Sequence, residues 1–318
     1  MSVEEINSCR ICGNKDLIPI IDLGHHALSA IFPAKHEPDP LEVPLILVKC
    51  NDEKNSQACG LLQLKHTVPG DTMYLNHYGY RSGINKTMTH HLKSIVDQLN
   101  SKIKLASGDV VLDIGSNDAT LLKYYDIPGL KRIGIDPTGD QFKEYYPKDI
   151  LLLSDFFTSE NFKKLSPDKR AKAITSIAMF YDLKEPMRFV KDVKDSLSRD
   201  GIWVFEQSYM PTMLELNSFD TICHEHLEYY TLKQIQWMMQ RSDLRILDVG
   251  FNDANGGSFR TIVGHADSPF KDNTDKIRSI LIKEKESGLE TQKPYKEFRE
   301  RVESIRNQIK KFINTYIL

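Results

Sequence analysis

The sequence lacks any long apolar segment, and no run approaches the roughly 18 apolar residues that a membrane-spanning helix requires. Residues Met1–Glu5 are acidic and contain no apolar core of the kind that a secretory signal needs. Charge imbalance is also small, since a net charge of −2 gives no general electrostatic reason to bind nucleic acid. These absences predict a cytoplasmic globular protein with no membrane span and no nucleic-acid partner.

A strand, a tight turn and a helix are predicted between residues 110 and 122. Residues 110–114 form an apolar run around Asp113, Gly115 makes the turn, and a helix is expected to begin near residues 117–118. A second strand, residues 132–136, also ends on a carboxylate, Asp136. Two strands, a glycine turn and an acid at the tip of the second strand are typical of a nucleoside site, in which the acid would hold ribose hydroxyls.

The turn lacks the later glycines of the G-x-G-x-x-G pattern, whose backbone amides hold a pyrophosphate. Asn117 and Ala119 stand in their place, and Asp113 and Asp118 bring negative charge, which disfavours a phosphate and favours a cation. S-adenosylmethionine (SAM) carries an adenosine, a sulfonium and an ammonium but no phosphate, so SAM is the cofactor that this turn favours. A NAD-type cofactor and a plain buried strand–helix unit remain as alternatives.

Strands and helices alternate through the centre of the chain, which predicts an α/β fold with a mainly parallel sheet. The strand candidates are 109–114, 132–136, 150–154, 173–178, 201–206, 245–251 and 258–264. The last two lack a helix between them, which predicts an antiparallel hairpin and thus a class I SAM-methyltransferase, Rossmann-like sheet. The expected divisions are a zinc-binding domain (1–70), a helical connector (71–107), a methyltransferase domain (108–268) and a C-terminal helical segment (269–318).

The C-terminal segment carries apolar residues at heptad spacing, namely Phe298, Val302, Ile305, Ile309, Phe312 and Tyr316. Such a stripe predicts either a helix that packs on its own domain or a contact with a second copy or a partner chain. The chain ends on apolar residues without a cap, which suggests a shortened protein or a partner surface.

Four of the five cysteines lie in the first 60 residues, as Cys9-x-x-Cys12-Gly13, Cys50 and Cys59. Two pairs of thiolates, the first at ideal spacing, predict a closed tetrahedral Zn²⁺ site that stabilises a small domain with a thin core. The second pair is unusual because eight residues separate its members. The alternative is a set of four thiols without metal.

A dense acid–base cluster, residues 220–230, follows the fifth strand of the predicted sheet. It contains His224, Glu225, His226, Tyr229 and Tyr230. Ligands of open α/β sheets lie beyond the carboxyl ends of the strands, so this segment is expected over the site and predicts a general base with an orienting network. A second metal site and a satisfied surface network are the alternatives. Cys223 is interpreted as packing, and the pairs at 25–26 and 90–91 as solvated or structural histidines.

Together these parts resemble the nucleotide-sugar C-methyltransferase family, which acts on NDP-4-keto-deoxysugars. The resemblance extends from about residue 6 to residue 265. It rests on the Cys9-x-x-Cys12-Gly13 knuckle and the segments at 22–24, 59–64, 78–82, 112–118, 205–206, 220–222, 224–226 and 256–260. The pair of His-Glu-His and Gly-Gly-Ser-x-Arg on a zinc-headed chain is its most specific part.

The resemblance implies the following site residues. SAM would lie on Gly115, Ser116 and Asn117, Asp136 would bind ribose, and Asp155 and Phe156 would lie near adenine. The segment from Ser176 to Phe180 would line the transfer site, and Asp113, at the turn, is a further candidate for cofactor binding. His226 would be the general base, with Glu225 beside it.

Three departures from the family stand out. Cys223 replaces a common Tyr, Ala119 replaces a frequent Gly, and typical members continue for roughly a hundred residues more, at the scale of a further domain. The missing part would supply much of the nucleotide-sugar side of the family's cleft.

The expected function is therefore a SAM-dependent C-methyltransferase acting on a nucleotide-linked 4-keto-deoxysugar, a small-molecule partner. His224, Tyr229, Tyr230 and Arg260 are candidate donors to the enolate oxygen. O- or N-methylation of another small molecule, and a SAM-binding partner subunit, are the alternatives.

Overall fold

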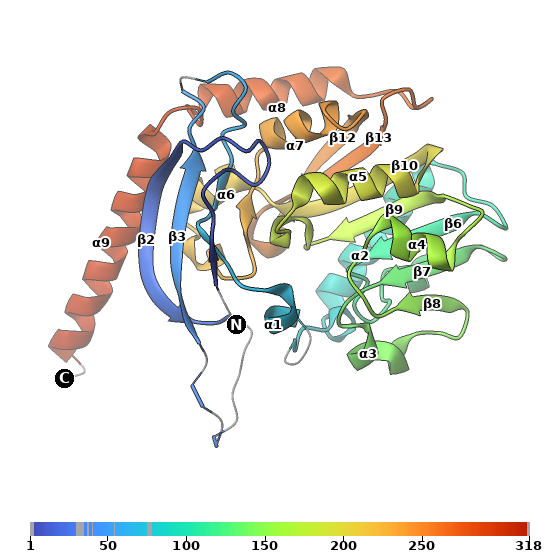
Figure 1. The fold of residues 1–318 in the computed structure, drawn as a ribbon, viewed down its shortest axis with the longest axis horizontal. Helices are drawn as coiled ribbons and strands as arrows, with labels where there is room; N and C mark the ends of the chain where they lie inside the picture. Colours follow the sequence, from blue (N-terminus) through green and yellow to red (C-terminus); the bar gives the residue numbers. More distant parts are fainter. Residues whose placement is uncertain are drawn as a thin grey trace.

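The computed structural model describes residues 3–29, 35–36, 38–39, 41–53, 55–74 and 78–316. Its centre is a seven-stranded sheet in the order β12-β13-β10-β9-β6-β7-β8 (Figure 1). The strands are β6 (Val110–Ile114), β7 (Lys131–Ile135), β8 (Ile150–Leu153), β9 (Ala171–Ile177), β10 (Leu197–Ser208), β12 (Leu244–Asn252) and β13 (Ser258–His265). All seven predicted strands are confirmed.

Pairing within this sheet is parallel from β10 to β8, whereas β13 runs antiparallel to both of its neighbours, β10 and β12. The predicted hairpin is therefore present, with its second strand inside the sheet and its first strand at the edge. Every residue of β6 is buried, as is expected of a parallel strand covered on both faces. The predicted class I SAM-methyltransferase fold is confirmed.

Amphipathic helices cover the sheet (Figure 1). The central ones are α2 (Lys86–Lys102), α3 (Gly139–Phe142), α4 (Ser159–Leu165), α5 (Pro186–Ser196) and α7 (Leu232–Gln240). Helix α2 buries the four apolar residues that its sequence spacing predicts, Leu92, Ile95, Val96 and Leu99. Pro186 begins α5, where its missing amide hydrogen costs nothing, and a Thr231–Gln234 capping box begins α7.

The helix expected near residues 117–118 is wrong. Only a short 3-10 turn, η2 (Leu122–Tyr124), follows the glycine turn, although Leu121 and Leu122 are buried as expected. Asn117 and Ala119 have positive φ angles of 48° and 61°, which interrupt any helix at its first turn.

A second sheet, in the order β11-β4-β3-β2, forms the N-terminal part. Its strands are β2 (Leu17–Ala27), β3 (Glu42–Cys50), β4 (Leu62–Leu64) and β11 (Glu228–Tyr229), and β1 (Glu4–Glu5) pairs with β5 (His66–Thr67) beside it. Strand β11 comes from the acid–base cluster and pairs with β4. The cluster is thus held directly by the N-terminal sheet. Helix α1 (Gly70–Tyr74) follows β5, and α6 (Met210–Leu216) precedes the cluster in the chain. The boundaries between the four predicted divisions stay a prediction.

The C-terminal segment forms α8 (Thr274–Glu286) and α9 (Lys293–Tyr316), and α9 lies along the outer side of β2 (Figure 1). Phe298 and Val302 are buried against the N-terminal sheet, whereas Ile309, Phe312 and Tyr316 are exposed. The heptad stripe therefore packs on its own chain over its first half, and a partner for its second half stays a prediction.

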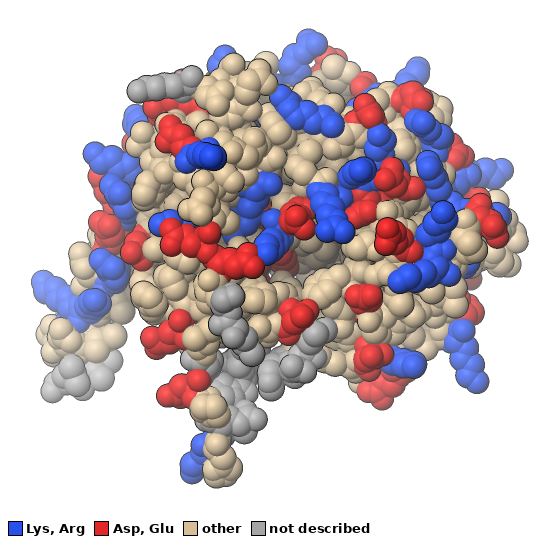
Figure 2. All heavy atoms as spheres, in the orientation of Figure 1, with Lys and Arg blue, Asp and Glu red and all other residues tan. Residues whose placement is uncertain are grey.

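The surface carries charges of both signs, and Lys or Arg side chains alternate with Asp or Glu over the face shown in Figure 2. This mixture agrees with the net charge of −2. Among the helices that the structure describes, none is both long and apolar enough to cross a membrane.

Candidate functional site

A cavity of about 620 Å³ lies at the carboxyl ends of the parallel strands. Its floor includes Ile114 of β6, Ile135 of β7, Ile177 of β9 and Glu206 of β10. This is the edge of an open α/β sheet at which ligands bind, and the volume is in the range of small-molecule and cofactor sites. Acids line the cavity at several points, and no Lys or Arg lines it among the described residues.

The turn after β6 is held in shape by the acid after β7. One carboxylate oxygen of Asp136 accepts a hydrogen bond from the Asn117 amide at 2.7 Å, and the other accepts from the amide and the hydroxyl of Thr138, both at 2.6 Å. The side chain of Asn117 accepts a hydrogen bond from the Ser82 amide at 2.9 Å. The turn is therefore fixed from two sides before any ligand binds.

Close packing around the turn requires glycine at two positions. Gly115 has a φ angle of +71°, and a Cβ there would lie 3.2 Å from Met179, another residue of the cavity wall. A Cβ on Gly134 would come within 2.5 Å of Ser116 Oγ, which lies 2.8 Å from the Tyr146 hydroxyl. The turn thus presents bare backbone to the cavity.

Six of the eight predicted cofactor residues line the cavity, namely Asp113, Gly115, Ser116, Asn117, Asp136 and Phe156. Two do not. Asp155 accepts a hydrogen bond from Asn161 at 3.0 Å, and Ser176 is fully buried and accepts one from the Trp203 indole at 2.9 Å.

Asp113 is a buried carboxyl on the cavity floor, and burial raises its pKa to about 7. The hydroxyl of Thr175 donates to it at 2.5 Å and favours the charged form, while the nearby Asp136 disfavours it. A buried acid with this pKa gains from a neighbouring cation. The donor set of the cavity, two acids beside a bare glycine turn, therefore fits SAM.

His226 is the one of the five predicted catalytic residues that lines the cavity, and Asp220 and Thr221 of the same cluster line it as well. Its Nδ1 lies 2.9 Å from the Thr221 carbonyl oxygen, which can only accept, so Nδ1 carries the proton. Nε2 makes no hydrogen bond with any residue that the structure describes and keeps its lone pair. Burial lowers the pKa of His226. The Tyr181 ring packs edge-on against the imidazole, with 4.3 Å between the two ring centroids.

The other predicted catalytic residues lie outside the cavity. His224 is buried with its Nε2 3.0 Å from the Val43 carbonyl oxygen, so it connects the cluster to β3. Tyr229 belongs to β11, and its hydroxyl lies 3.4 Å from the Thr221 carbonyl oxygen. Tyr230 is fully buried and stacks on Phe180. Glu225 does not line the cavity either, and burial raises its pKa.

Arg260, a candidate donor, is also absent from the cavity lining. Its Nε donates to the Glu206 carboxylate at 2.8 Å, and Glu206 also pairs with His91. His91 and Glu206 both line the cavity, although the sequence assigned no chemistry to the histidine pair at 90–91.

Further cavity residues that the sequence reasoning missed come from distant segments. They are Tyr74 and Tyr78, from before α2, and Tyr181 and Asp182, from the 3-10 turn η4 (Phe180–Asp182) after β9. The resemblance implied a transfer-site segment that ends at Phe180, just before Tyr181 and Asp182. The one available signal for these two residues was the position of η4 at the carboxyl end of a strand.

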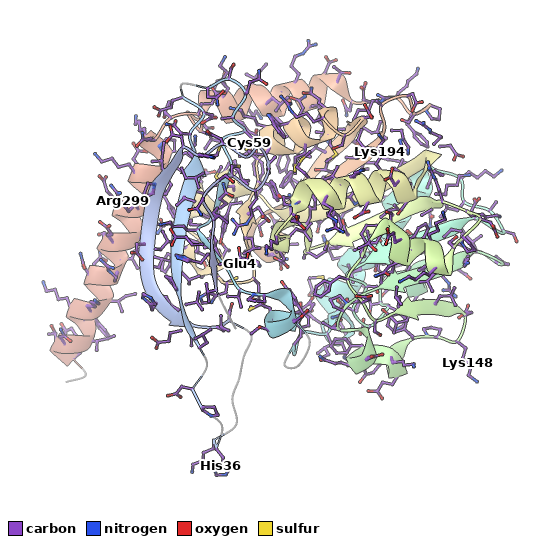
Figure 3. All side chains as sticks on the ribbon, in the orientation of Figure 1. Glu4, His36, Cys59, Lys148, Lys194 and Arg299 are labelled. Atoms are coloured by element: carbon purple, nitrogen blue, oxygen red, sulfur yellow. The ribbon has the colours of Figure 1, made fainter. Side chains whose placement is uncertain are left out.

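The four N-terminal cysteines meet as predicted. Their sulfur atoms all lie within 4.8 Å of one another, with Cys9 and Cys59 3.4 Å apart and Cys12 and Cys50 3.5 Å apart. Sulfur atoms around a tetrahedral Zn²⁺ at about 2.3 Å are separated by roughly 3.8 Å, so this donor set fits zinc. Cys59, labelled in Figure 3, lies beside α7, whose Gln234 donates to its carbonyl oxygen at 2.9 Å.

A buried ion pair joins this metal site to the acid–base cluster. Arg10, inside the cysteine knuckle, lies 3.6 Å from the carboxylate of Glu228, two residues after His226. Arg10 also donates to the Leu64 carbonyl oxygen of β4 at 2.6 Å. The knuckle, β4 and β11 therefore form one continuous support for the segment that carries His226.

Comparison with known proteins gives three family matches along the chain. Residues 9–74 match the family described as "Putative zinc binding domain", residues 84–249 match "Methyltransferase domain", and residues 253–316 match "C-methyltransferase C-terminal domain". The methyltransferase match alone spans more than half of the 318 residues.

The comparison also finds single proteins to which this chain is similar. The C-methyltransferase NovU of Streptomyces niveus is 26% identical over 314 residues, which are 98% of this chain and 73% of that protein. Among solved structures, a Haloferax volcanii methyltransferase complex with the activator Trm112 is 13% identical over 57% of this chain and 94% of that chain, with a TM-score of 0.45. The plantazolicin methyltransferase BpumL, bound to a substrate analogue and SAH, is 12% identical over 57% of this chain and 87% of that chain, with a TM-score of 0.45.

The family matches and the cavity at the carboxyl ends of the sheet lead to one conclusion. The chain belongs to the SAM-dependent methyltransferases, as a C-methyltransferase with a zinc-binding domain at its N-terminal end.

Proposed function

We propose that this C-methyltransferase acts on a nucleotide-linked 4-keto-deoxysugar and methylates the ring carbon next to the ketone. The observation that carries the proposal is the state of His226, a half-buried imidazole with a lowered pKa, whose Nε2 is unpaired within the described residues and which lines the cavity. Methylation at carbon needs a base of this kind, because a C–H bond must lose its proton first. The ordered resemblance of residues 6–265 to enzymes of deoxysugar biosynthesis supports the substrate class.

In the proposed reaction, His226 Nε2 takes a proton from the carbon adjacent to the ketone. The C–H electron pair forms a carbon–carbon double bond, and the ketone oxygen takes up the negative charge as an enolate. SAM, when bound, supplies an electrophilic methyl group. The enolate carbon would form the new C–C bond as the methyl–sulfur bond of SAM breaks, so that the neutral thioether S-adenosylhomocysteine leaves with the sulfonium electron pair and the ketone is regenerated. The Thr221 carbonyl oxygen, 2.9 Å from Nδ1, stabilises the imidazolium that results from the first step.

The cofactor side of the cavity would be held by residues that are already fixed. Asp136 is proposed to bind the ribose hydroxyls, Phe156 to contact adenine, and the turn at residues 115–117 to receive the amino-acid portion of SAM. Asp113 would face the positive charge of that portion from the floor.

This assignment predicts a pH dependence of SAM binding. The positive charge of SAM favours ionised Asp113, so below its pKa of about 7 binding must displace a proton. We expect the Kd for SAM to rise as pH falls below 7, by up to about tenfold per unit, and to level off above 7. Calorimetric titrations from pH 5.5 to 8.5 measure it. In Asp113→Asn binding is weaker and its pH dependence is lost; an unchanged slope in this variant would exclude Asp113.

The proposed substrate is tested by incubating the protein with methyl-labelled SAM and a panel of NDP-4-keto-6-deoxysugars, followed by NMR of the product. A labelled methyl group on a ring carbon is the expected result. In D₂O without SAM, we also expect deuterium at the same carbon, because proton removal precedes transfer. O- or N-methylation gives no such exchange, and a partner subunit gives SAM binding without transfer.

A further inference from the structure

Asp182 is a buried carboxyl that lines the cavity next to the segment of His226. It ends η4, and the carbonyl oxygen of its neighbour Tyr181 accepts a hydrogen bond from the Leu227 amide at 2.8 Å. The Tyr181 ring in turn packs on the imidazole of His226. Asp182 and the proposed base therefore lie on two segments that are joined directly, and both face the same cavity.

The carboxyl of Asp182 has an unfilled hydrogen-bonding position. The hydroxyl of Tyr74 bonds to the group, but Oδ1 is buried without a hydrogen-bond partner among the residues that the structure describes. A buried polar atom without a partner is costly, because it has lost its bond to water without compensation. Because Asp182 lines the cavity, its carboxyl group lies at the surface that a bound ligand would contact.

The groups around Asp182 decide its protonation state. Burial and the carboxylates of Glu225 and Glu228 raise its pKa well above the usual value, against the weaker opposing effect of the bond to Tyr74. The other titratable groups that face it, Tyr78 and Tyr181, also have raised pKa values because they are buried, so they supply no positive charge. Burial raises the pKa of Glu225 and Glu228 as well, so this group of acids favours the protonated form, in which Asp182 can donate a hydrogen bond.

We propose that Asp182 donates a hydrogen bond to the ketone oxygen of the substrate and to the enolate oxygen that forms when His226 removes the proton. This inference rests on the proposed function. It replaces the four predicted donors, since none of them lines the cavity: His224, Tyr229, Tyr230 and Arg260. A neutral acid in an apolar site strengthens its hydrogen bond as charge develops on the acceptor, which selectively stabilises the transition state.

Two substitutions test this role. Asp182→Asn keeps the size and an N–H donor, whereas Asp182→Leu keeps the approximate size and removes every polar atom. The measurements are deuterium exchange into an NDP-4-keto-6-deoxysugar, methyl transfer, and SAM affinity. We expect D182L to lower kcat for exchange and transfer by about 10²–10³-fold, and D182N by less than about tenfold, with SAM affinity unchanged in both.

Each other outcome is decisive. D182L with wild-type kcat overturns the donor role, and a loss in D182N as large as in D182L overturns it in favour of a carboxylate function. Asp182→Ala replaces D182L if the leucine variant does not fold. If the wild-type protein neither exchanges nor methylates the keto sugar, the proposed function itself fails. If the wild type is active and D182L is equally active, only the proposed role of Asp182 fails.

Discussion

Replacing His226 with asparagine is expected to lower methyl transfer and substrate deuterium exchange by about 10²–10⁴-fold. The reason lies in the two ring nitrogens. Nδ1 is fixed by the Thr221 carbonyl oxygen at 2.9 Å, so Nε2 alone keeps a free lone pair, on a ring that lines the cavity. The amide nitrogen of asparagine reaches the position of Nδ1 and keeps the bond to Thr221, but nothing replaces Nε2 as a base.

The matched control is His224→Asn, two residues earlier in the same segment. His224 bonds to the Val43 carbonyl oxygen and does not line the cavity, so this variant tests support of the segment without removing a cavity base. We expect H224N to lose stability but to keep most of its kcat, while SAM affinity stays unchanged in H226N. Exchange in H226N at more than a tenth of the wild-type rate would contradict the assignment of His226 as the base.

Loss of zinc is expected to have the second large effect, on stability as well as activity. Metal binding by four thiolates contributes about 10–16 kcal/mol in small zinc domains, so Cys59→Ser should lose zinc and unfold the N-terminal sheet. Because that sheet pairs with β11, and Arg10 contacts Glu228, the segment of His226 should lose its support at the same time. Metal content, thermal unfolding and SAM binding together measure the effect.

Cys223→Ser provides the control for the zinc experiment. Cys223 is the fifth cysteine and lies outside the metal cluster, so this variant should keep one zinc per chain and an unchanged unfolding temperature. A C59S protein that contains no zinc and yet unfolds at the wild-type temperature would show that the four thiols need no metal. In that case the contact between Arg10 and Glu228 would be sufficient support.

The sequence alone determined the features that depend on local pattern. The seven strands follow from short apolar runs with polar ends, because a strand buried on both faces admits few other residues. The zinc site follows from cysteine type and spacing, even across the eight residues between Cys50 and Cys59. Acids at the ends of β6 and β7 likewise predicted a cation-binding, SAM-type cavity.

The local sequence pattern gave a wrong prediction where a contact between distant segments fixes the backbone conformation. Apolar Leu121 and Leu122 suggested a helix directly after the glycine turn, but Asp136 and Ser82 hold Asn117 in a left-handed conformation that ends it. The contacts of Asn117 with Asp136 and Ser82 join separate segments of the chain, so the local sequence around the turn does not reveal them.

Only the tertiary structure decided which members of the acid–base cluster reach the cavity. His224 and His226 are the same residue type two positions apart, and the pairing of β11 with β4 turns one toward β3 and leaves the other at the cavity. Asp182 and Tyr74 come from segments more than a hundred residues apart and meet only through folding. Burial among other acids, which gives Asp182 its proton, is a property of that meeting, because a carboxyl group in an extended chain is ionised at neutral pH.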